Sequence, residues 1–522
     1  MKFKIATMVF IAAACHSCMN SRNGAEIKPR LYQEQFRPQY HFSPAKMWTN
    51  DPNGLVYLNG EYHLFYQYYP DSTVWGPMHW GHAISTDLLH WQHLPIALYP
   101  DSLGYIFSGS AVIDTASTSG LGEPGKPAMV AIFTYHNPVL EKAGKNNYQY
   151  QGLAYSLDKG RSWTKYKNNP VLPNPGLRDF RDPNVSWNIA AGKWILTLAA
   201  GDHLCFYSSV NLKEWKLESE FGKGIGAHGG VWECPSLFEM SVSNEPGTKK
   251  WVLLVSINPG GPDGGSATQY FTGTFDGHSF KNDDNTIRWI DNGPDNYAGI
   301  LWSNTGDRKI FLGWMNNWNY ANLVPTSPWR GQMTIPRELS LFKSAEGYMV
   351  RSLPVKEIST LLKTILNKGN ITPDDKGIEF KFKGDELTRS KTDLNFHTDE
   401  NAELTLEISN GIGQKIIFGV NPGKGELFAD RTNGGIRSFS QSFAASVHKT
   451  DIPKITGNIN LTILLDNCSA ELFLQDGLYN MTELIFPEKA YNSFKVSFRH
   501  GEGTIDSLKI NSVESVWKIK NE

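Results

Sequence analysis

Short runs of apolar, aromatic and β-branched residues, separated by turn signals, recur along most of this chain, and helical periodicity is scarce. Residues 62–68 (YHLFYQY) and 251–255 (WVLLV) are typical of these runs, and their length and residue types predict β-strands. Asn-Gly or Asp-Gly pairs at residues 59–60, 276–277 and 476–477 mark turns between such strands. The pattern predicts an all-β protein.

A weak internal repeat divides the first part of the chain into units. In each unit an apolar run leads to Ser or Thr, then to Asp or Asn two residues later, and then to an aromatic residue. These turns begin at Ser85, Ser156, Ser209 and Thr274. Units of roughly 50–70 residues with about four short strands each are typical of the blades of a β-propeller. Five strand groups are present, and they begin near Asp51, Phe107, Asp182, Glu233 and Asp295.

The pattern of polar and apolar residues changes after the fifth strand group. Residues 345–370 contain the one plausible helical or linker stretch, and from residue 371 onward polar and apolar residues alternate, as in residues 403–408 (ELTLEI). Alternation of this kind is typical of a sandwich of two sheets, and this part holds no convincing acid pair, which indicates an accessory role. The predicted organisation is a five-bladed propeller at residues 37–344, a linker at 345–370 and a C-terminal β-sandwich at 371–522.

Residues 1–18 have the pattern of a secretory signal. Lys2 and Lys4 precede an apolar run at residues 5–14, which is too short to span a membrane. A cysteine after small residues resembles a bacterial lipoprotein cleavage site, and either Cys15 or Cys18 fits as the lipidated residue; a plain signal peptide is the alternative. The polar residues 19–36 have the composition of a tether. The sequence predicts export to the cell envelope, at the periplasm or the cell surface, with a lipid anchor.

Composition narrows the class of protein further. A formal net charge of −2 over 522 residues gives no reason to expect a nucleic acid partner. The chain holds 16 Trp, 21 Tyr and 27 Phe; most such rings belong to a core, although flat rings also suit sugar binding. Beyond the signal segment only Cys205, Cys234 and Cys468 remain, which is no disulfide scaffold. No Cys/His cluster has metal-ligand spacing, so we expect no metal and no cofactor.

Three carboxylates lie at the start of apolar strands, each with a proline one or two residues later. They are Asp51, Asp182 and Glu233, which lie 131 and 51 residues apart. Each such segment alone is more often structural than catalytic. In a propeller, however, the first strand of every blade lines the central channel, so equivalent positions converge on the axis. Two carboxylates that flank a glycosidic bond suffice for its hydrolysis, and the sequence therefore predicts a glycosidase.

The immediate sequence neighbours predict different protonation states for the three acids. Asp51 lies among amide and backbone donors, which favour the charged form and suit a nucleophile. Glu233 lies between Trp232 and Cys234, an apolar setting that is expected to raise its pKa and suit a general acid. The cation of Arg181 is expected to hold Asp182 ionised, as a group that orients sugar hydroxyls and stabilises the transition state.

These segments also resemble a known family. Residues 48–54 (WTNDPNG), 180–183 (FRDP) and 232–235 (WECP) are similar to the three diagnostic motifs of glycoside hydrolase family 32, which contains invertases, inulinases and levanases. Further similar segments lie at residues 76–82, 107–110, 295–298, 313–318, 328–330 and 465–473. The resemblance covers roughly residues 37–515. One departure is Thr49, where methionine is usual, and we expect it to alter packing rather than chemistry.

The resemblance implies a five-bladed propeller with a β-sandwich and retention of configuration at fructose C2. It makes Asp51 the nucleophile, Asp182 the transition-state stabiliser and Glu233 the acid/base. Retention implies that the carboxyl groups of Asp51 and Glu233 lie about 5–5.5 Å apart. The substrate pocket implied by the family comprises Asn50, Gln67, Trp75, Phe107, Ser108, Arg181, Asp295 and Trp318.

The leading hypothesis is an exported fructan β-fructosidase that removes terminal fructose from levan, inulin or sucrose. Residues 75–82 and 98–101 look more like those of exo-acting levanases and inulinases than of plant invertases. An endo-levanase or a fructosyltransferase of the same family is the closest rival. A fructan-binding lipoprotein without chemistry is a further alternative, which the presence of both Asp51 and Glu233 disfavours. The sequence predicts neither the preferred linkage nor the oligomeric state.

Overall fold

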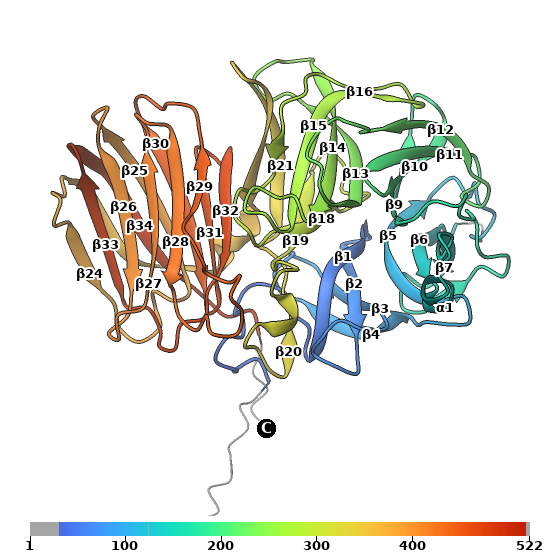
Figure 1. Cartoon of the computed structure of the whole chain (residues 1–522), viewed down its shortest axis with the longest axis horizontal. Helices are drawn as coiled ribbons and strands as arrows, with labels where there is room; N and C mark the ends of the chain where they lie inside the picture. Colours follow the sequence, from blue (N-terminus) through green and yellow to red (C-terminus); the bar gives the residue numbers. More distant parts are fainter. Residues whose placement is uncertain (1–30, 124, 518–522) are drawn as a thin grey trace, which may run out of the picture.

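The computed structural model describes residues 31–123 and 125–517, so the predicted signal segment and the candidate lipidation sites Cys15 and Cys18 lie outside the described residues. Two β domains lie side by side, one a ring of short sheets and the other a pair of longer sheets (Figure 1). The described residues form 34 strands, one α-helix, α1 (Pro138–Lys142), and two 3-10 turns, η1 (Ala321–Leu323) and η2 (Lys356–Leu361). The predicted all-β class is confirmed. No helix among them is long and apolar enough to cross a membrane.

The first domain consists of five sheets, which are the blades of a propeller, and the first four strands of each blade pair antiparallel in succession. Blade 1 contains β1 (Met47–Leu58), β2 (Glu61–Tyr69), β3 (His79–Ser85) and β4 (Gln92–Leu98), with β20 (Trp329–Arg330) added parallel to β1. Blade 2 contains β5 (Tyr105–Asp114), β6 (Ala128–His136), β7 (Gln149–Ser156) and β8 (Thr164–Lys165). Blade 3 contains β9 (Phe180–Asn188), β10 (Lys193–Ala200), β11 (His203–Ser209) and β12 (Lys216–Phe221). Blade 4 contains β13 (Val231–Ser241), β14 (Lys249–Asn258), β15 (Ala267–Phe275), β16 (Phe280–Asn282) and β17 (Arg288–Trp289). Blade 5 contains β18 (Tyr297–Leu301), β19 (Ile310–Trp314), β21 (Arg337–Ser344) and β22 (Gly347–Pro354).

The first strands of the five blades close a ring around the axis. β1 contacts β5, β5 contacts β9, β9 contacts β13, β13 contacts β18, and β18 returns to β1. Equivalent positions on these strands are therefore brought together although they are far apart in sequence. The predicted five-bladed propeller is confirmed.

The repeated turn is the connection between the third and fourth strands of the first four blades. In blade 1, Asp87 Oδ1 accepts hydrogen bonds from the backbone N–H groups of Leu89 and His90 at 3.0 and 2.8 Å. Asn211 in blade 3 and Asp276 in blade 4 accept equivalent pairs of backbone bonds. A short polar side chain that bonds the backbone two and three residues on fixes a tight turn. This local chemistry is why the repeat is visible in the sequence.

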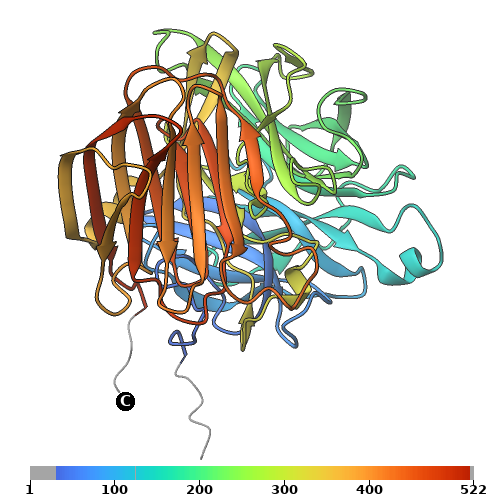
Figure 2. The ribbon, with the colours of Figure 1, turned by 60° about the vertical axis from the view of Figure 1, so that its left-hand side comes forward.

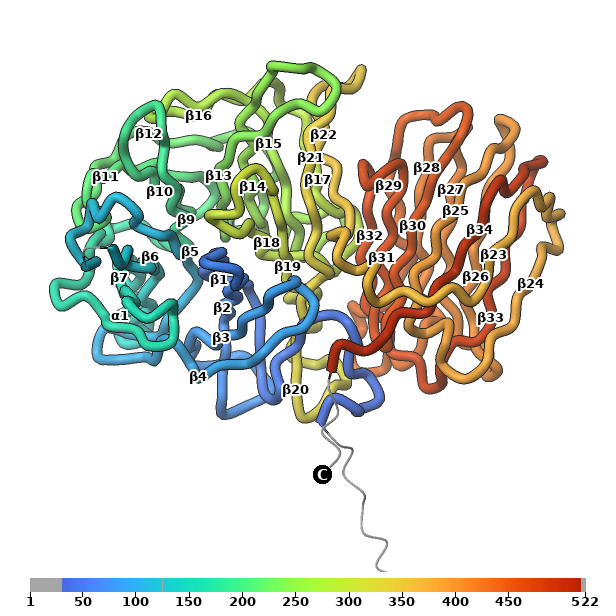
Figure 3. Tube along the Cα trace, turned by 180° about the vertical axis from the view of Figure 1, so that it is seen from behind, coloured from blue at the N-terminus to red at the C-terminus, as the bar shows by residue number. Residues whose placement is uncertain are grey.

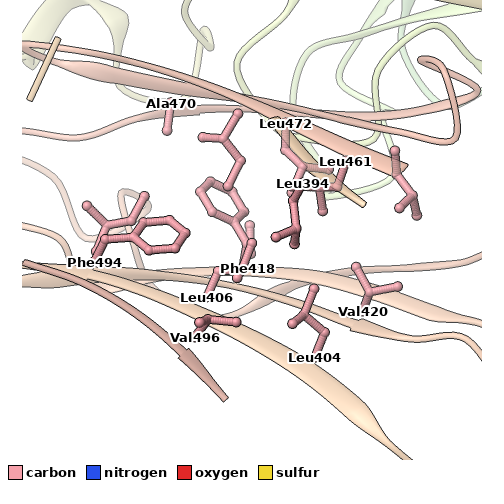
Figure 4. Close-up of a cluster of buried hydrophobic side chains, with 14 of the residues drawn as sticks. Leu394, Leu404, Leu406, Phe418, Val420, Leu461, Ala470, Leu472, Phe494 and Val496 are labelled. Carbon is pink, nitrogen blue, oxygen red and sulfur yellow. The ribbon is translucent and has the colours of Figure 1, made fainter. Parts of the chain in front are cut away.

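The second domain is a sandwich of two six-stranded sheets. One sheet has the order β23 (Leu362–Ile371), β34 (Gly503–Val513), β25 (Ser390–Thr398), β30 (Ile459–Asp466), β31 (Ser469–Leu474) and β32 (Tyr479–Leu484). The other has the order β24 (Ile378–Lys381), β33 (Ser493–Arg499), β26 (Glu403–Ser409), β27 (Lys415–Asn421), β28 (Glu426–Asn433) and β29 (His448–Asp451). Figure 2 shows this sandwich in front of the propeller. The alternation that predicted it now has its cause: Leu394 and Leu472 of one sheet and Leu404, Leu406 and Val496 of the other point into a shared apolar core (Figure 4).

The predicted domain boundaries require two corrections. Most of the predicted linker 345–370 is strand, because β22 pairs with β21 in blade 5 and β23 pairs with β34 in the sandwich. Only residues 355–361, with η2, connect the domains, as the rear view shows (Figure 3).

The C-terminal boundary of the predicted tether 19–36 is also wrong. The described end of that segment is packed: Tyr32 stacks on Trp517 at 4.1 Å between ring centroids, and Phe36 is buried against Phe486. The last described residues return beside these first ones, where Val516 N donates to Gln39 O (Figure 3). A polar average composition concealed these aromatic anchors.

Buried charged residues join the two domains. Arg337 of blade 5 donates to Asp291 at 2.8 Å and also bonds Glu471 of the sandwich. His41 lies between the same Glu471, at 2.7 Å, and Asp466, at 2.8 Å. All of these side chains are fully buried, so each charge depends on its partners for solvation.

We expect the stability of the folded chain to fall as the pH rises from about 6.5 to about 9. Burial alone would lower the pKa of His41, but hydrogen bonds from its ring to Asp466 and Glu471 outweigh this and raise the pKa from 6.5 to about 9. Because the folded pKa is the higher one, the stabilisation is complete below pH 6.5 and is lost as the pH rises through 9; it amounts to about 3 kcal/mol. Urea unfolding at pH 6 and pH 9.5 measures it. His41→Gln should flatten this pH dependence, and an unchanged dependence in that variant would contradict the assignment.

Candidate active site

The first strands of the blades break their regular pairing where they carry the predicted functional residues. The register shifts between Thr49 and Pro52 in β1, between Ile106 and Gly109 in β5, and between Glu233 and Ser236 in β13. Opposite β9, the shift lies between Thr197 and Ala199, which places Asp182 and Pro183 at the irregularity. Asp182 and Cys234 have left-handed backbone angles, with φ of 64° and 46°. Such bulges turn side chains out of the ladder and are frequent beside active sites.

A cavity of about 480 Å³ lies at these bulges. It is lined by Asp51, Asp182 and Glu233, so the structure brings the three acids together. The other lining residues that the sequence singled out are Asn50, Gln67, Trp75, Phe107, Ser108, Arg181 and Trp318. Lining residues that sequence reasoning missed are His136, Glu141, Tyr148, Gln149, Asp179, Asn258 and Asn322.

Asp51 is held by donors from three different segments. Ser108 Oγ donates to Oδ2 at 2.6 Å, Asn50 Nδ2 donates to Oδ1 at 3.0 Å, and Cys234 Sγ lies 3.5 Å from Oδ2. Burial raises the pKa of Asp51, and these hydrogen bonds oppose the rise because they favour the carboxylate. The local amide donor that the sequence indicated is therefore present, together with two donors that only the fold supplies.

Glu233 has a more polar environment than its sequence neighbours indicate. Its Oε1 accepts hydrogen bonds from Nη2 and Nε of Arg181 at 2.8 and 3.1 Å, and its Oε2 accepts one from the Tyr297 hydroxyl. Trp232 points away into the core between blades 3 and 4, and Cys234 Sγ faces the other two acids. The predicted apolar setting is wrong, because side chains that are adjacent along a strand do not share a face. Burial nevertheless raises the pKa of Glu233, with Arg181 opposing and the charge of Asp51 adding to the rise.

Asp182 also does not have Arg181, its neighbour in sequence, as its main partner. Arg181 Nε lies 3.9 Å from its carboxylate, whereas the same guanidinium bonds Glu233 and, at 2.6 Å, Asp179. Asp182 Oδ2 instead accepts the backbone N–H of Cys234 at 3.1 Å. Burial raises the pKa of Asp182 to about 7, Arg181 opposes this, and the carboxylates of Glu233 and Asp51 add to it. Arg181 therefore favours the ionised form of Asp182, as the sequence indicated, but burial and the neighbouring carboxylates outweigh it.

Asp295, a predicted pocket residue, lies outside the cavity. It is fully buried at the domain interface, where it binds the guanidinium of Arg431 and accepts the backbone N–H of Leu484 at 2.7 Å. The Tyr320 hydroxyl completes its contacts. The motif around residues 295–298 reaches the site through Tyr297, which bonds Glu233.

One wall of the cavity comes from an insertion that the strand pattern left unexplained. Residues 137–148 connect β6 to β7 and contain α1, whose first turn is capped by the Asn137 side chain. Glu141 of this helix lies 3.0 Å from His136, and the ring of His136 stacks on Phe107 at 4.3 Å. The unusual length of this connection, in a domain of short hairpins, was the available sequence signal.

The comparisons with known proteins agree with this architecture. Residues 41–352 match the glycosyl hydrolases family 32 N-terminal domain, and residues 357–512 match the C-terminal domain of the same family. The chain is 44% identical over 493 residues to a levanase of Bacillus subtilis (strain 168), covering 93% of this chain and 72% of that one. It is 38% identical over 530 residues to an extracellular exo-inulinase of Aspergillus awamori, covering 93% and 96%.

Solved structures give the same result for the fold. The crystal structure of exo-inulinase from Aspergillus awamori superposes with a TM-score of 0.86 at 37% identity, covering 93% of this chain and all of that one. A fructofuranosidase from Schwanniomyces occidentalis complexed with fructose superposes with a TM-score of 0.83 at 32% identity, covering 94% and 100%. With both domains matched in order, the chain belongs to glycosyl hydrolases family 32 and is a glycoside hydrolase.

Proposed function

We propose that this chain is an exo-acting, retaining fructan β-fructosidase that releases terminal fructose from levan, inulin and sucrose. The observation that carries the proposal is the convergence of Asp51, Asp182 and Glu233 in one cavity, on three separate blades. Its volume of about 480 Å³ is at the small end of the range for ligand sites, which suits a chain end rather than a long polymer segment.

The proposed reaction has two steps. Asp51 attacks C2 of fructose as its glycosidic C2–O bond breaks, and the proton of Glu233 passes to the departing oxygen. In the second step Glu233 takes a proton from water, the water oxygen bonds to C2, and the bond from C2 to Asp51 breaks. The donors around Asp51 support its ionised form, and burial supports a proton on Glu233.

The remaining cavity residues position these groups. Asp182 and Asp51 both contact Cys234, whose Sγ is 3.5 Å from Asp51 and 3.7 Å from Asp182. We expect the carboxyl oxygens of Asp182 to accept hydrogen bonds from fructose hydroxyls. Arg181, fixed by Asp179, sets the orientation of Glu233. Trp75 and Phe107, in edge contact at 6.1 Å, provide flat apolar surface for a sugar ring.

The names of the relatives support the proposed substrate class and the proposed export of this chain. Their names specify levan and inulin as polymers, and the fructofuranosidase structure holds fructose. The Aspergillus enzymes are named extracellular, which supports export of this chain. We also propose that a lipid on Cys15 or Cys18 attaches the chain to a membrane. Mass spectrometry of the N-terminal peptides that trypsin releases from the membrane fraction tests which cysteine carries the lipid.

A time course of products from levan and inulin tests the proposed activity. With the purified chain lacking residues 1–18, we expect fructose alone from the earliest time point, because an exo enzyme removes one unit at a time. The faster polymer identifies the preferred linkage. A ladder of oligosaccharides would indicate an endo-levanase, and longer fructans formed from sucrose would indicate a fructosyltransferase. No product from either polymer or from sucrose would favour a binding protein without chemistry.

A further inference from the structure

A second group of reactive side chains lies on blade 3, outside the cavity. His203 and Cys205 are two residues apart on β11, so their side chains share one face of the sheet. Glu220 of β12 is the direct pairing partner of Cys205. A ring nitrogen of His203, the sulfur of Cys205 and a carboxylate oxygen of Glu220 all lie within 4.8 Å of one another.

The imidazole of His203 lacks the partners that a buried ring requires. The residue is 8% exposed, and neither ring nitrogen has a hydrogen-bond partner among the described residues. Nε2 lies 3.9 Å from Glu220 Oε1, and Nδ1 lies 3.6 Å from Asp202 Oδ1, both too far for a hydrogen bond. Leaving a buried polar group unpaired is costly, and native structures do so rarely. The ring is therefore placed for a partner other than these side chains.

We propose that His203, Cys205 and Glu220 bind a zinc ion. Imidazole nitrogen, thiolate sulfur and carboxylate oxygen are the three donor types that zinc takes in proteins. Nitrogen and oxygen ligands on a tetrahedral zinc ion lie about 3.4 Å apart, and sulfur lies about 3.6 Å from either. The observed 3.9 Å between His203 Nε2 and Glu220 Oε1 therefore requires a small contraction, and the pairs with Cys205 Sγ, which lie within 4.8 Å, must close by up to about 1 Å. Water takes the fourth position from the side of Glu220, whose side chain is 39% exposed.

The neighbouring Asp202 and the second carboxylate oxygen of Glu220 fit this arrangement. Asp202 faces the second nitrogen of His203, as the outer carboxylate does beside many zinc-bound histidines. Lys223 bonds Glu220 through Oε2 only, which leaves Oε1 directed at His203. A plain Lys–Glu ion pair would explain Glu220, but it would not explain the unpaired nitrogens of His203.

The position of the cluster predicts a structural role. None of the three ligands lines the cavity. They adjoin the turn between β10 and β11, where Gly201 N donates to Asp179 O at 3.1 Å and Gly201 O accepts Trp232 N at 2.7 Å. Binding should therefore stiffen the support behind the cavity without entering the chemistry. The site could not be predicted from the spacing of residues in the sequence, because only the pairing of β11 with β12 brings Glu220 beside His203 and Cys205.

Cobalt(II) added to the chelator-stripped full chain tests the proposal. We expect one Co²⁺ per chain, with a sulfur-to-cobalt charge-transfer band and the strong visible bands of tetrahedral cobalt, and displacement by Zn²⁺. Cys205→Ser should abolish the charge-transfer band. The matched control is Cys468→Ser, an equally buried thiol that donates to Gln332 and should leave the band intact.

A half-exposed ligand provides a second variant that should fold. We expect Glu220→Gln to weaken Zn²⁺ binding at least tenfold and to remove the rise in melting temperature that Zn²⁺ gives the unaltered chain. The proposal is overturned if the unaltered chain binds no Co²⁺ or if Glu220→Gln binds Zn²⁺ normally. It is also overturned if the band survives in Cys205→Ser and disappears in Cys234→Ser. None of these readouts depends on the proposed fructosidase activity.

Discussion

Asp51→Asn is expected to lower kcat on levan by about 10⁴-fold or more, the scale seen when a reaction loses its nucleophile. The amide keeps the shape of the side chain and its place beside Asn50 and Ser108, but it does not form the ester bond to fructose C2. The unfolding transition should remain close to that of the unaltered chain, because the neighbouring hydroxyl can still bond the remaining carbonyl oxygen. Steady-state kinetics and urea unfolding of the same preparation check both statements.

Glu233→Gln separates the two carboxylate roles. General acid catalysis contributes about 10²–10⁴-fold, so a loss of that size is expected on levan. On an aryl β-fructofuranoside, whose leaving group departs without a proton, formation of the fructosyl enzyme should be nearly unimpaired in Glu233→Gln but still blocked in Asp51→Asn. Turnover close to that of the unaltered chain in either variant on levan, or a reversal of the two aryl results, would contradict the assigned roles.

Arg431→Met is expected to lower the free energy of unfolding by about 3–5 kcal/mol, the usual cost of removing one partner from a buried ion pair. Arg431 of β28 binds Asp295 of the propeller and the backbone oxygen of Leu484, and its Nε lies 3.1 Å from Glu483 Oε2. Methionine fills similar space but leaves the fully buried Asp295 without its cation and Glu483 with His448 alone, at 2.8 Å. Urea unfolding measures the difference.

Arg161→Met is the matched control for this substitution. Arg161 makes two 2.7 Å bonds to Glu61, but both side chains are partly exposed, so its loss should cost less than about 1 kcal/mol. Equal losses in the two variants would contradict the importance of the buried interface charges.

Local chemistry determined what could be predicted from sequence. The blades were visible because the turns at Asp87, Asn211 and Asp276 use the same side-chain bonds, and the repeat then placed the three acids on equivalent strands. The sandwich was visible because its strands alternate between core and solvent.

Features that depend on contacts between distant segments could not be predicted from the sequence. Arg181 bonds Glu233, 52 residues away on another blade, at 2.8 Å, and lies 3.9 Å from the carboxylate of its neighbour Asp182. Asp295 meets Arg431, 136 residues away, at an interface that no local pattern describes. The α1 wall and the His203 cluster likewise depend on how strands pair and on which face each side chain takes.

The stereochemistry of methanolysis tests the central claim most directly. The unaltered chain acts on sucrose in aqueous methanol, and NMR identifies the methyl fructofuranoside that forms before equilibration. A fructosyl intermediate on Asp51 that is attacked from the opposite face, with Glu233 as base, predicts methyl β-fructofuranoside. Methyl α-fructofuranoside as the first product would mean single displacement and would contradict Asp51 as nucleophile.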